Sequence, residues 1–154
     1  MTALESHTTH SEAETTAVAR RMAAQLSTGD VVLLHGDLGA GKTAFVRGLA
    51  EGLGIPDEEV SSPTFTLIQE YRCGRLPLFH VDLYRLNDPR EIEDLGLDEI
   101  GADGVLAIEW AEKLPRPIEG ALEVRIAHAD GDTRNLTIQS PPDRSPDRPI
   151  HSDR

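Results

Sequence analysis

The stretch from Val31 to Thr43, VVLLHGDLGAGKT, constrains the fold of this chain more than any other feature. Its first four residues are apolar and half of them are β-branched, which predicts a buried strand over residues 31–34. The residues that follow match G-x-x-x-x-G-K-[S/T], the pattern of a phosphate-binding P-loop. Residues 44–50 have helical character, so strand, glycine loop and helix occur in the order that a P-loop requires.

The residue types of this stretch suit the binding of phosphate groups. Glycines let successive backbone N–H groups turn inward around an anion. The following helix adds its unpaired N-terminal N–H groups and the positive end of its dipole. Lys42 would reach the β- and γ-phosphates, and the hydroxyl of Thr43 would bind Mg²⁺. Asp37 lies inside the loop, where its carboxylate would repel phosphate unless the side chain points away. Alternatively, Asp37 could bind the attacking water.

Phosphoryl chemistry also requires an acidic residue, usually at the C-terminal end of a strand beside the P-loop strand. Asp82 follows the apolar strand expected at 76–83, and Glu109 follows the apolar run at 105–108. The pattern alone leaves open which of the two carboxylates binds Mg²⁺. We expect His80 to point to the opposite face from Asp82 and not to act as a base. Trp110 could pack in the core or against another subunit, or it could contribute to the site.

Local signals predict the remaining elements. Ser11 and Glu14 form a capping box that begins a helix running to about Leu26. Alternating apolar residues separated by turn residues predict two hairpins, one with strands 64–71 and 76–83 and one with strands 121–127 and 134–139. A proline after Asp88 marks the start of an acidic helical segment over residues 88–103. The last segment holds seven acids and one base, which indicates either a solvated face or a docking surface for a basic partner.

The chain is expected to form one α/β domain over residues 11–139. Residues 1–10 and the proline-rich residues 140–154 are expected to be disordered. The N-terminus has no apolar segment typical of a secretory signal, and no apolar run is long enough to cross a membrane. The single cysteine, Cys73, suits a reducing cytoplasm. We therefore expect a cytoplasmic location and no contact with a membrane.

Charge and missing motifs narrow the function. The net charge is −12, and such a surface repels nucleic acid, so any role in RNA chemistry would run through partner proteins. The chain has no N/T-K-x-D stretch that reads guanine, which favours ATP over GTP. It also has no arginine-rich lid and no second substrate domain, which argues against nucleoside and shikimate-type kinases.

Five sequence blocks in fixed order resemble the TsaE family, the bacterial P-loop ATPases of tRNA threonylcarbamoyladenosine biosynthesis. The blocks are GDLGAGKT (36–43), SPTFTL (62–67), HVDLYRL (80–86), EDLGLDE (93–99) and IEW (108–110). The resemblance implies a three-layer α/β fold like that of P-loop NTPases, with a mixed sheet and an antiparallel hairpin insertion. It also implies Mg²⁺-dependent ATP hydrolysis that is slow unless the chain is assembled with the TsaD and TsaB proteins. These partners transfer the threonylcarbamoyl group to adenosine beside the anticodon, and tRNA is contacted only through the complex.

The resemblance also implies roles for residues of this chain. Thr43 and Glu109 match the Mg²⁺ ligands, and Lys42, Asp82 and Glu109 match the catalytic positions. The nucleotide is expected to contact Thr15, Gly36, Asp37, Leu38, Gly39, Ala40, Gly41, Lys42, Thr43, Ala44 and Arg134. The residues leave two other functions open. A small-molecule kinase would transfer phosphate to a metabolite without partners, and a nucleotide-gated scaffold would need ATP binding but no hydrolysis.

Overall fold

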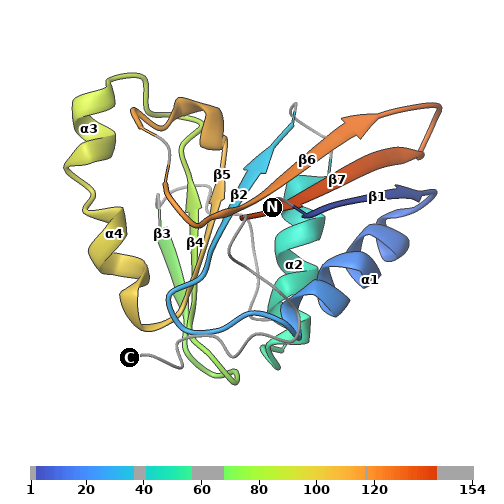
Figure 1. Ribbon diagram of the computed structural model, residues 1–154, viewed down its shortest axis with the longest axis horizontal. Coiled ribbons are helices and arrows are strands. Elements are labelled where there is room, and N and C mark those ends of the chain that lie inside the picture. Colours follow the sequence, from blue (N-terminus) through green and yellow to red (C-terminus); the bar gives the residue numbers. More distant parts are fainter. Residues whose placement is uncertain (1–2, 37–40, 57–67, 117, 142–154) are drawn as a thin grey trace.

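The computed structural model describes residues 3–36, 41–56, 68–116 and 118–141, which form an α/β fold around a seven-stranded mixed sheet (Figure 1). The strand order is β1-β7-β6-β2-β5-β4-β3. The strands are β1 (Ala3–Thr9), β2 (Val31–His35), β3 (Ile68–Tyr71), β4 (Leu78–Asp82), β5 (Val105–Glu109), β6 (Leu122–His128) and β7 (Arg134–Ser140). The helices are α1 (Glu12–Ala23), α2 (Lys42–Gly52), α3 (Pro89–Glu93) and α4 (Leu97–Ile100), with short 3₁₀ turns η2 (Gly101–Asp103) and η3 (Ala111–Lys113). The expected α/β class and mixed sheet are confirmed.

Four parallel strands form the centre of the sheet. β2 pairs in parallel with β5 on one side and with β6 on the other, and β4 pairs in parallel with β5. The apolar runs at 31–34 and 105–108 are continuous because both faces of these strands are covered. Both predicted strands are confirmed, and β2 lies directly beside the strand that ends in Glu109.

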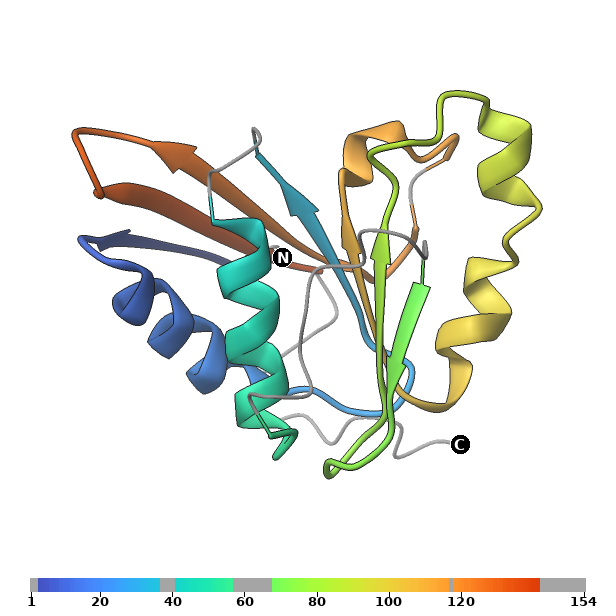
Figure 2. The same cartoon turned by 180° about the vertical axis from the view of Figure 1, so that it is seen from behind.

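Helices α1 and α2 pack together on one face of the sheet (Figures 1 and 2). Ser11 caps α1 as predicted, because its side chain accepts the N–H of Glu14. Glu14 in turn accepts the N–H of His10 at 2.7 Å, one residue before the position that a capping box would use. The α-helix ends at Ala23, and a tightened turn continues it to Leu26, near the predicted end.

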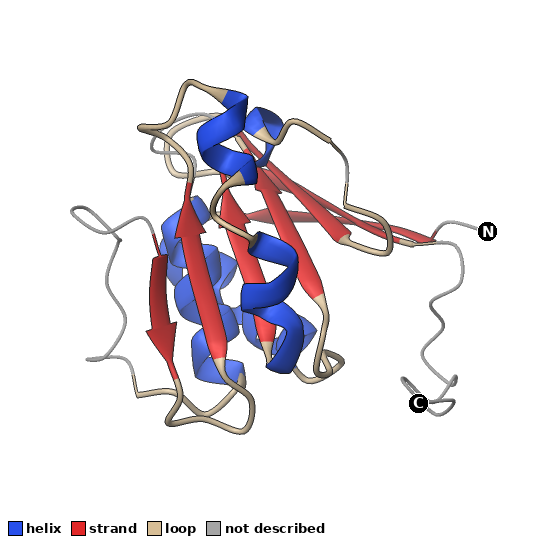
Figure 3. Cartoon of the chain, turned by 90° about the vertical axis from the view of Figure 1, so that its left-hand side faces the viewer, coloured by secondary structure: helices blue, strands red, loops and turns tan. Residues whose placement is uncertain are grey.

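Among the described residues, the opposite face is covered by the two short helices α3 and α4 and by the turn η3 (Figure 3). α3 begins where the sequence predicts, with Asp88 as its cap and Pro89 in its first turn. The two faces bury separate hydrophobic cores, since alternate side chains of each strand point to opposite sides. In β2, Val32 and Leu34 face α1 and α2, whereas Leu33 faces α3 and α4.

The two predicted hairpins are present. β3 pairs antiparallel with β4, from Ile68 opposite Val81 to Tyr71 opposite Leu78. Residues 64–67 of the expected first strand lie outside the described part of the chain. β6 and β7 also pair antiparallel, and Asp130 begins the turn that joins them.

The N-terminal segment differs from the prediction. Residues 1–10 were expected to be disordered, but Ala3–Thr9 forms β1, which pairs antiparallel with β7 along its whole length. The backbone N–H and C=O groups of β7 would otherwise be unpaired at the edge of the sheet, and pairing satisfies them without a hydrophobic pattern. Leu4 is the only large aliphatic side chain of β1 and is 67% exposed, which explains why the sequence gives no signal. Ser140 belongs to β7, and the rest of the predicted tail, residues 142–154, lies outside the described residues. None of the helices described is long and apolar enough to cross a membrane.

Candidate functional site

The N-terminus of α2 forms the first part of the candidate site. Gly41 caps the helix with a φ of 110°, a backbone conformation that side chains with a Cβ rarely adopt. Its carbonyl accepts the N–H of Phe45 at 3.0 Å, which closes the first turn. Asp37, Leu38, Gly39 and Ala40 lie outside the described residues, so their contacts with phosphate stay predictions.

Lys42 is held between the end of β2 and an aromatic ring. Its side chain is buried, and its Nζ donates a hydrogen bond to the carbonyl oxygen of Gly36. The same nitrogen lies 3.6 Å from the centre of the Trp110 ring, which is a close cation–π contact. Trp110 adopts a left-handed φ of 61°, and its ring stacks at a tilt against Tyr84, with 5.0 Å between the ring centres. Trp110 therefore packs directly on Lys42.

Glu109 connects α2 to the neighbouring strands. Its carboxylate is buried at the end of β5, and its Oε2 accepts a hydrogen bond from Thr43 Oγ1 at 3.4 Å. The same oxygen lies 2.5 Å from Nε2 of His80 on β4. Thr43 and Glu109, the two predicted metal ligands, are thus neighbours although they are 66 positions apart in the chain.

These residues fit a Mg²⁺ ion bound together with a nucleotide. Mg²⁺ prefers oxygen ligands and usually takes only one or two carboxylates from the protein, with water and phosphate oxygens completing its shell. The adjacent hydroxyl of Thr43 and carboxylate of Glu109 supply such oxygens. Within the described ranges there is no group of three or more His, Cys, Asp and Glu side chains that could hold a metal without further ligands.

Asp82 lies at the end of β4, in register with Glu109 on β5. Its Oδ1 accepts the N–H of Tyr84 at 2.9 Å. Burial raises the pKa of Asp82, and the nearby charge of Glu109 adds to the rise. The Tyr84 hydrogen bond, His80 and Lys42 oppose this shift without cancelling it. A half-buried carboxylate with a raised pKa is a candidate proton acceptor at a phosphoryl-transfer site.

The expectation that His80 points away from Asp82 is wrong. Side chains two residues apart in a strand lie on the same face, so His80 and Asp82 share the face covered by α2. His80 is completely buried and contacts Glu109 through Nε2. Its Nδ1 has no hydrogen-bond partner among the described residues. The parity of positions 80 and 82 was the signal in the sequence that could have placed this histidine at the site.

Thr15 and Arg134 line one cavity at the start of α2. The cavity has a volume of about 210 Å³, and Gly41 and Ala44 lie in the same wall. Thr15 is buried and its Oγ1 lies 2.7 Å from that of Thr9 at the end of β1. Arg134 donates through Nη1 to the carbonyl oxygens of the β6–β7 turn. The structure therefore brings both residues to the helix end where a nucleotide is expected.

Lys113 is a further residue that sequence reasoning did not assign. Its Nζ donates to the carbonyl oxygens of Tyr84 at 2.7 Å and Leu86 at 3.1 Å, and to Oδ1 of Asn87 at 3.3 Å. These bonds tie η3 to the segment that follows Asp82. No local pattern marks such a contact between distant parts of the chain.

Comparisons with known proteins agree on one family. A family model described as threonylcarbamoyl adenosine biosynthesis protein TsaE matches residues 9–136. The curated TsaE of Bacillus subtilis is 51% identical over 130 residues, covering 81% of this chain and 78% of that protein. The TsaE of a Nostoc species is 47% identical over 119 residues, covering 73% of this chain and 72% of that protein. The crystal structure of Bacillus subtilis YdiB superposes with a TM-score of 0.72 at 41% identity, covering 91% of this chain and 87% of that one. The chain therefore belongs to the TsaE family.

Proposed function

We propose that this chain is a cytoplasmic Mg²⁺-dependent ATPase that serves the formation of threonylcarbamoyladenosine in tRNA. The relatives at 51% and 47% identity carry the name tRNA threonylcarbamoyladenosine biosynthesis protein TsaE, which supports the pathway. One observation carries the chemistry. The hydroxyl of Thr43 and the carboxylate of Glu109 lie 3.4 Å apart at the start of a helix that follows a glycine loop, beside the buried Lys42. This arrangement supports a P-loop NTPase site.

Each residue of the site has a distinct task in this proposal. Lys42 and the N-terminal N–H groups of α2 bind the phosphates and neutralise their charge. Thr43 and Glu109 hold Mg²⁺, which supplies positive charge at the phosphate oxygens when it is bound. Asp82 orients the attacking water and accepts its proton, a role that its raised pKa favours. The cavity lined by Thr15 and Arg134 takes the rest of the nucleotide.

His80 acts as a positioning residue for Glu109. A histidine nitrogen 2.5 Å from Oε2 fixes the rotamer of the carboxylate and leaves Oε1 without a bond to this ring. Outer partners of this kind orient metal ligands and strengthen metal binding. The carboxylate is therefore held toward Thr43 before the metal arrives.

The chain is proposed to act with TsaD and TsaB and to meet tRNA only through them. A net charge of −12 opposes direct contact with the phosphate backbone of RNA. In this proposal hydrolysis by the isolated chain is slow, and the exposed side chain of Tyr84, two residues after Asp82, is available for contact with a partner. The threonylcarbamoyl transfer itself belongs to the partners.

The test replaces Thr43 by Ala and measures ATP hydrolysis with purified TsaD and TsaB present. Loss of a metal ligand is expected to lower the rate by about 100-fold or more, in the range seen when a key electrostatic group is removed from an active site. Thr137→Ala, on β7 between Ser6 of β1 and Arg125 of β6, is the matched control and should keep the rate. A Thr43→Ala protein that hydrolyses ATP normally would refute the assigned Mg²⁺ site.

A further inference from the structure

The two faces of the sheet differ in how completely their apolar side chains are covered. Among the residues that the structure describes, the core beneath α1 and α2 has a single partly buried hydrophobic residue at its margin, Leu76. The core beneath α3 and α4 has nine: Val31, Ile68, Leu86, Leu95, Ile100, Trp110, Leu114, Ile118 and Ala121. The reason is the length of the covering helices, since α3 has five residues and α4 has four. This face is a thin layer that leaves apolar surface within reach of another molecule.

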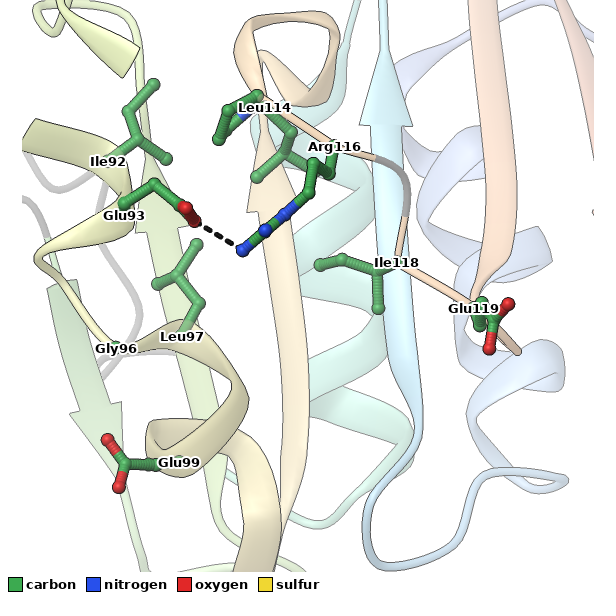
Figure 4. Close-up of a pocket in the computed structure, with 10 residues that line it drawn as sticks. Ile92, Glu93, Gly96, Leu97, Glu99, Leu114, Arg116, Ile118 and Glu119 are labelled. Carbon is green, nitrogen blue, oxygen red and sulfur yellow. Dashed lines mark hydrogen bonds and ion pairs between the residues drawn. The ribbon is translucent and has the colours of Figure 1, made fainter. Parts of the chain in front are cut away.

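A groove of about 580 Å³ runs through this layer (Figure 4). Its walls are α3 and α4 on one side and the segment that follows η3 on the other. Ile92, Leu97, Leu114 and Ile118 lie along these walls and contribute apolar surface, while polar groups make up the larger part of the lining (Figure 4). A volume of this size falls within the range of pockets that bind compact ligands or protruding side chains.

The rim of the groove is acidic. Glu93, Glu99 and Glu119 lie around it with Arg116 as the one base. Arg116 is already neutralised, because its Nη2 lies 2.6 Å from Oε2 of Glu93 and bridges the two walls (Figure 4). Within the part of the chain that the structure describes, Glu99 and Glu119 have no ion-pair partner. The rim therefore presents uncompensated negative charge beside the apolar side chains of the walls.

We propose that this groove binds a segment of a partner protein that carries a large apolar side chain flanked by lysine or arginine. The apolar side chain fills the groove, and the basic flanks meet Glu99 and Glu119. An apolar centre with a charged rim is the usual anatomy of a protein interface. The acidic rim repels RNA and anionic membranes, so the charge favours a basic protein segment over these two. The inference rests on the proposed function, because it assigns a surface to the partner-dependent assembly.

The test measures binding of the full chain to the purified complex of TsaD and TsaB, with ATP and Mg²⁺ present, at 50 and 300 mM NaCl. The rim variant reverses two charges, Glu99→Lys and Glu119→Lys. The control variant makes the same change in charge on the other side of the molecule, Glu5→Lys and Asp130→Lys, at exposed positions of β1 and the β6–β7 turn. A third variant, Ile118→Ala, shortens one side chain of the walls.

The rim variant is expected to bind at least about tenfold more weakly at low salt, and its affinity should depend less on salt than that of the unaltered chain. The control variant should lose less than about twofold. Ile118→Ala should weaken binding at both salt concentrations, since an apolar contact is not screened. Equal losses in the rim and control variants, or unchanged binding by the rim variant, would overturn the groove assignment alone. If the unaltered chain does not bind the complex, the proposed function and this inference fail together.

Discussion

Replacing His80 by Leu tests whether the histidine holds the carboxylate of Glu109. The substitution keeps a side chain of similar size in a fully buried position but removes the contact of 2.5 Å to Oε2. Loss of a hydrogen bond to a charged group costs about 1.5–3 kcal/mol. Leu also removes Nδ1, which is buried without a partner among the described residues and whose removal returns about 1 kcal/mol. We expect a net destabilisation of about 1–2 kcal/mol, which corresponds to a fall in Tm of about 3–6 °C for a domain of this size.

A double-mutant cycle separates this contact from general damage to the core. Urea unfolding would be measured for His80→Leu, Glu109→Leu and the double variant. Removing both partners eliminates the buried carboxylate, so His80→Leu should cost little in the Glu109→Leu background, and the coupling energy should be about 1.5–3 kcal/mol. His128→Leu, at an exposed position of β6, should show no coupling to Glu109. A coupling energy below about 0.5 kcal/mol for His80 and Glu109 would refute the positioning role.

Two further substitutions probe the site and its support. Asp82→Asn removes a carboxyl group whose pKa is raised by burial while an acceptor oxygen remains for the Tyr84 N–H. Because the pKa of Asp82 is raised in the folded state, the unaltered protein loses stability as the pH rises through that pKa, whereas the Asn variant does not. The Tm of the variant minus that of the unaltered protein should therefore be larger at pH 7 than at pH 4. The same difference at both pH values would contradict this. Gly48→Ala would place a Cβ 2.3 Å from the Thr16 carbonyl oxygen and 2.7 Å from the Cβ of Ala19, which forces α1 and α2 apart. The overpacking cost of about 1–3 kcal/mol should outweigh the gain of about 1 kcal/mol in helix propensity, so the Tm should fall. An unchanged Tm would show that the two helices can separate freely.

The sequence predicts the elements whose signals are local. The buried strands at 31–34 and 105–108, the helix capped by Ser11 and the turn of the second hairpin all depend on neighbours within a few positions. β1 was missed because its stability comes from the open edge of β7, more than a hundred residues away in the chain. An edge strand that pairs through backbone groups needs no apolar pattern, so composition suggested disorder instead.

The candidate site also has parts that local sequence signals predict and parts that they do not. The P-loop pattern and the two strand-end carboxylates follow from spacing, and the structure brings Thr43, Glu109 and Asp82 to one end of the sheet. The contacts of Lys42 with Trp110 and of Lys113 with the segment after Asp82 join distant parts of the chain, and single positions do not predict them. The histidine was misplaced for a different reason, since the alternation of strand side chains already puts residue 80 on the face of Asp82.

The site and the groove are built by the same two connections of the chain. The first leaves β4 at Asp82 and enters α3, where Ile92 lines the groove. The second leaves β5 at Glu109 and passes through η3 to Leu114 in the opposite wall. Lys113 ties the two connections together, because its ammonium bonds to the carbonyl oxygens that follow Asp82. Each strand-end carboxylate is therefore joined to one wall of the groove by a short connection, ten positions from Asp82 to Ile92 and five from Glu109 to Leu114. We expect a displacement of either carboxylate to shift that wall, a coupling that a double-mutant cycle between the site and the groove would measure.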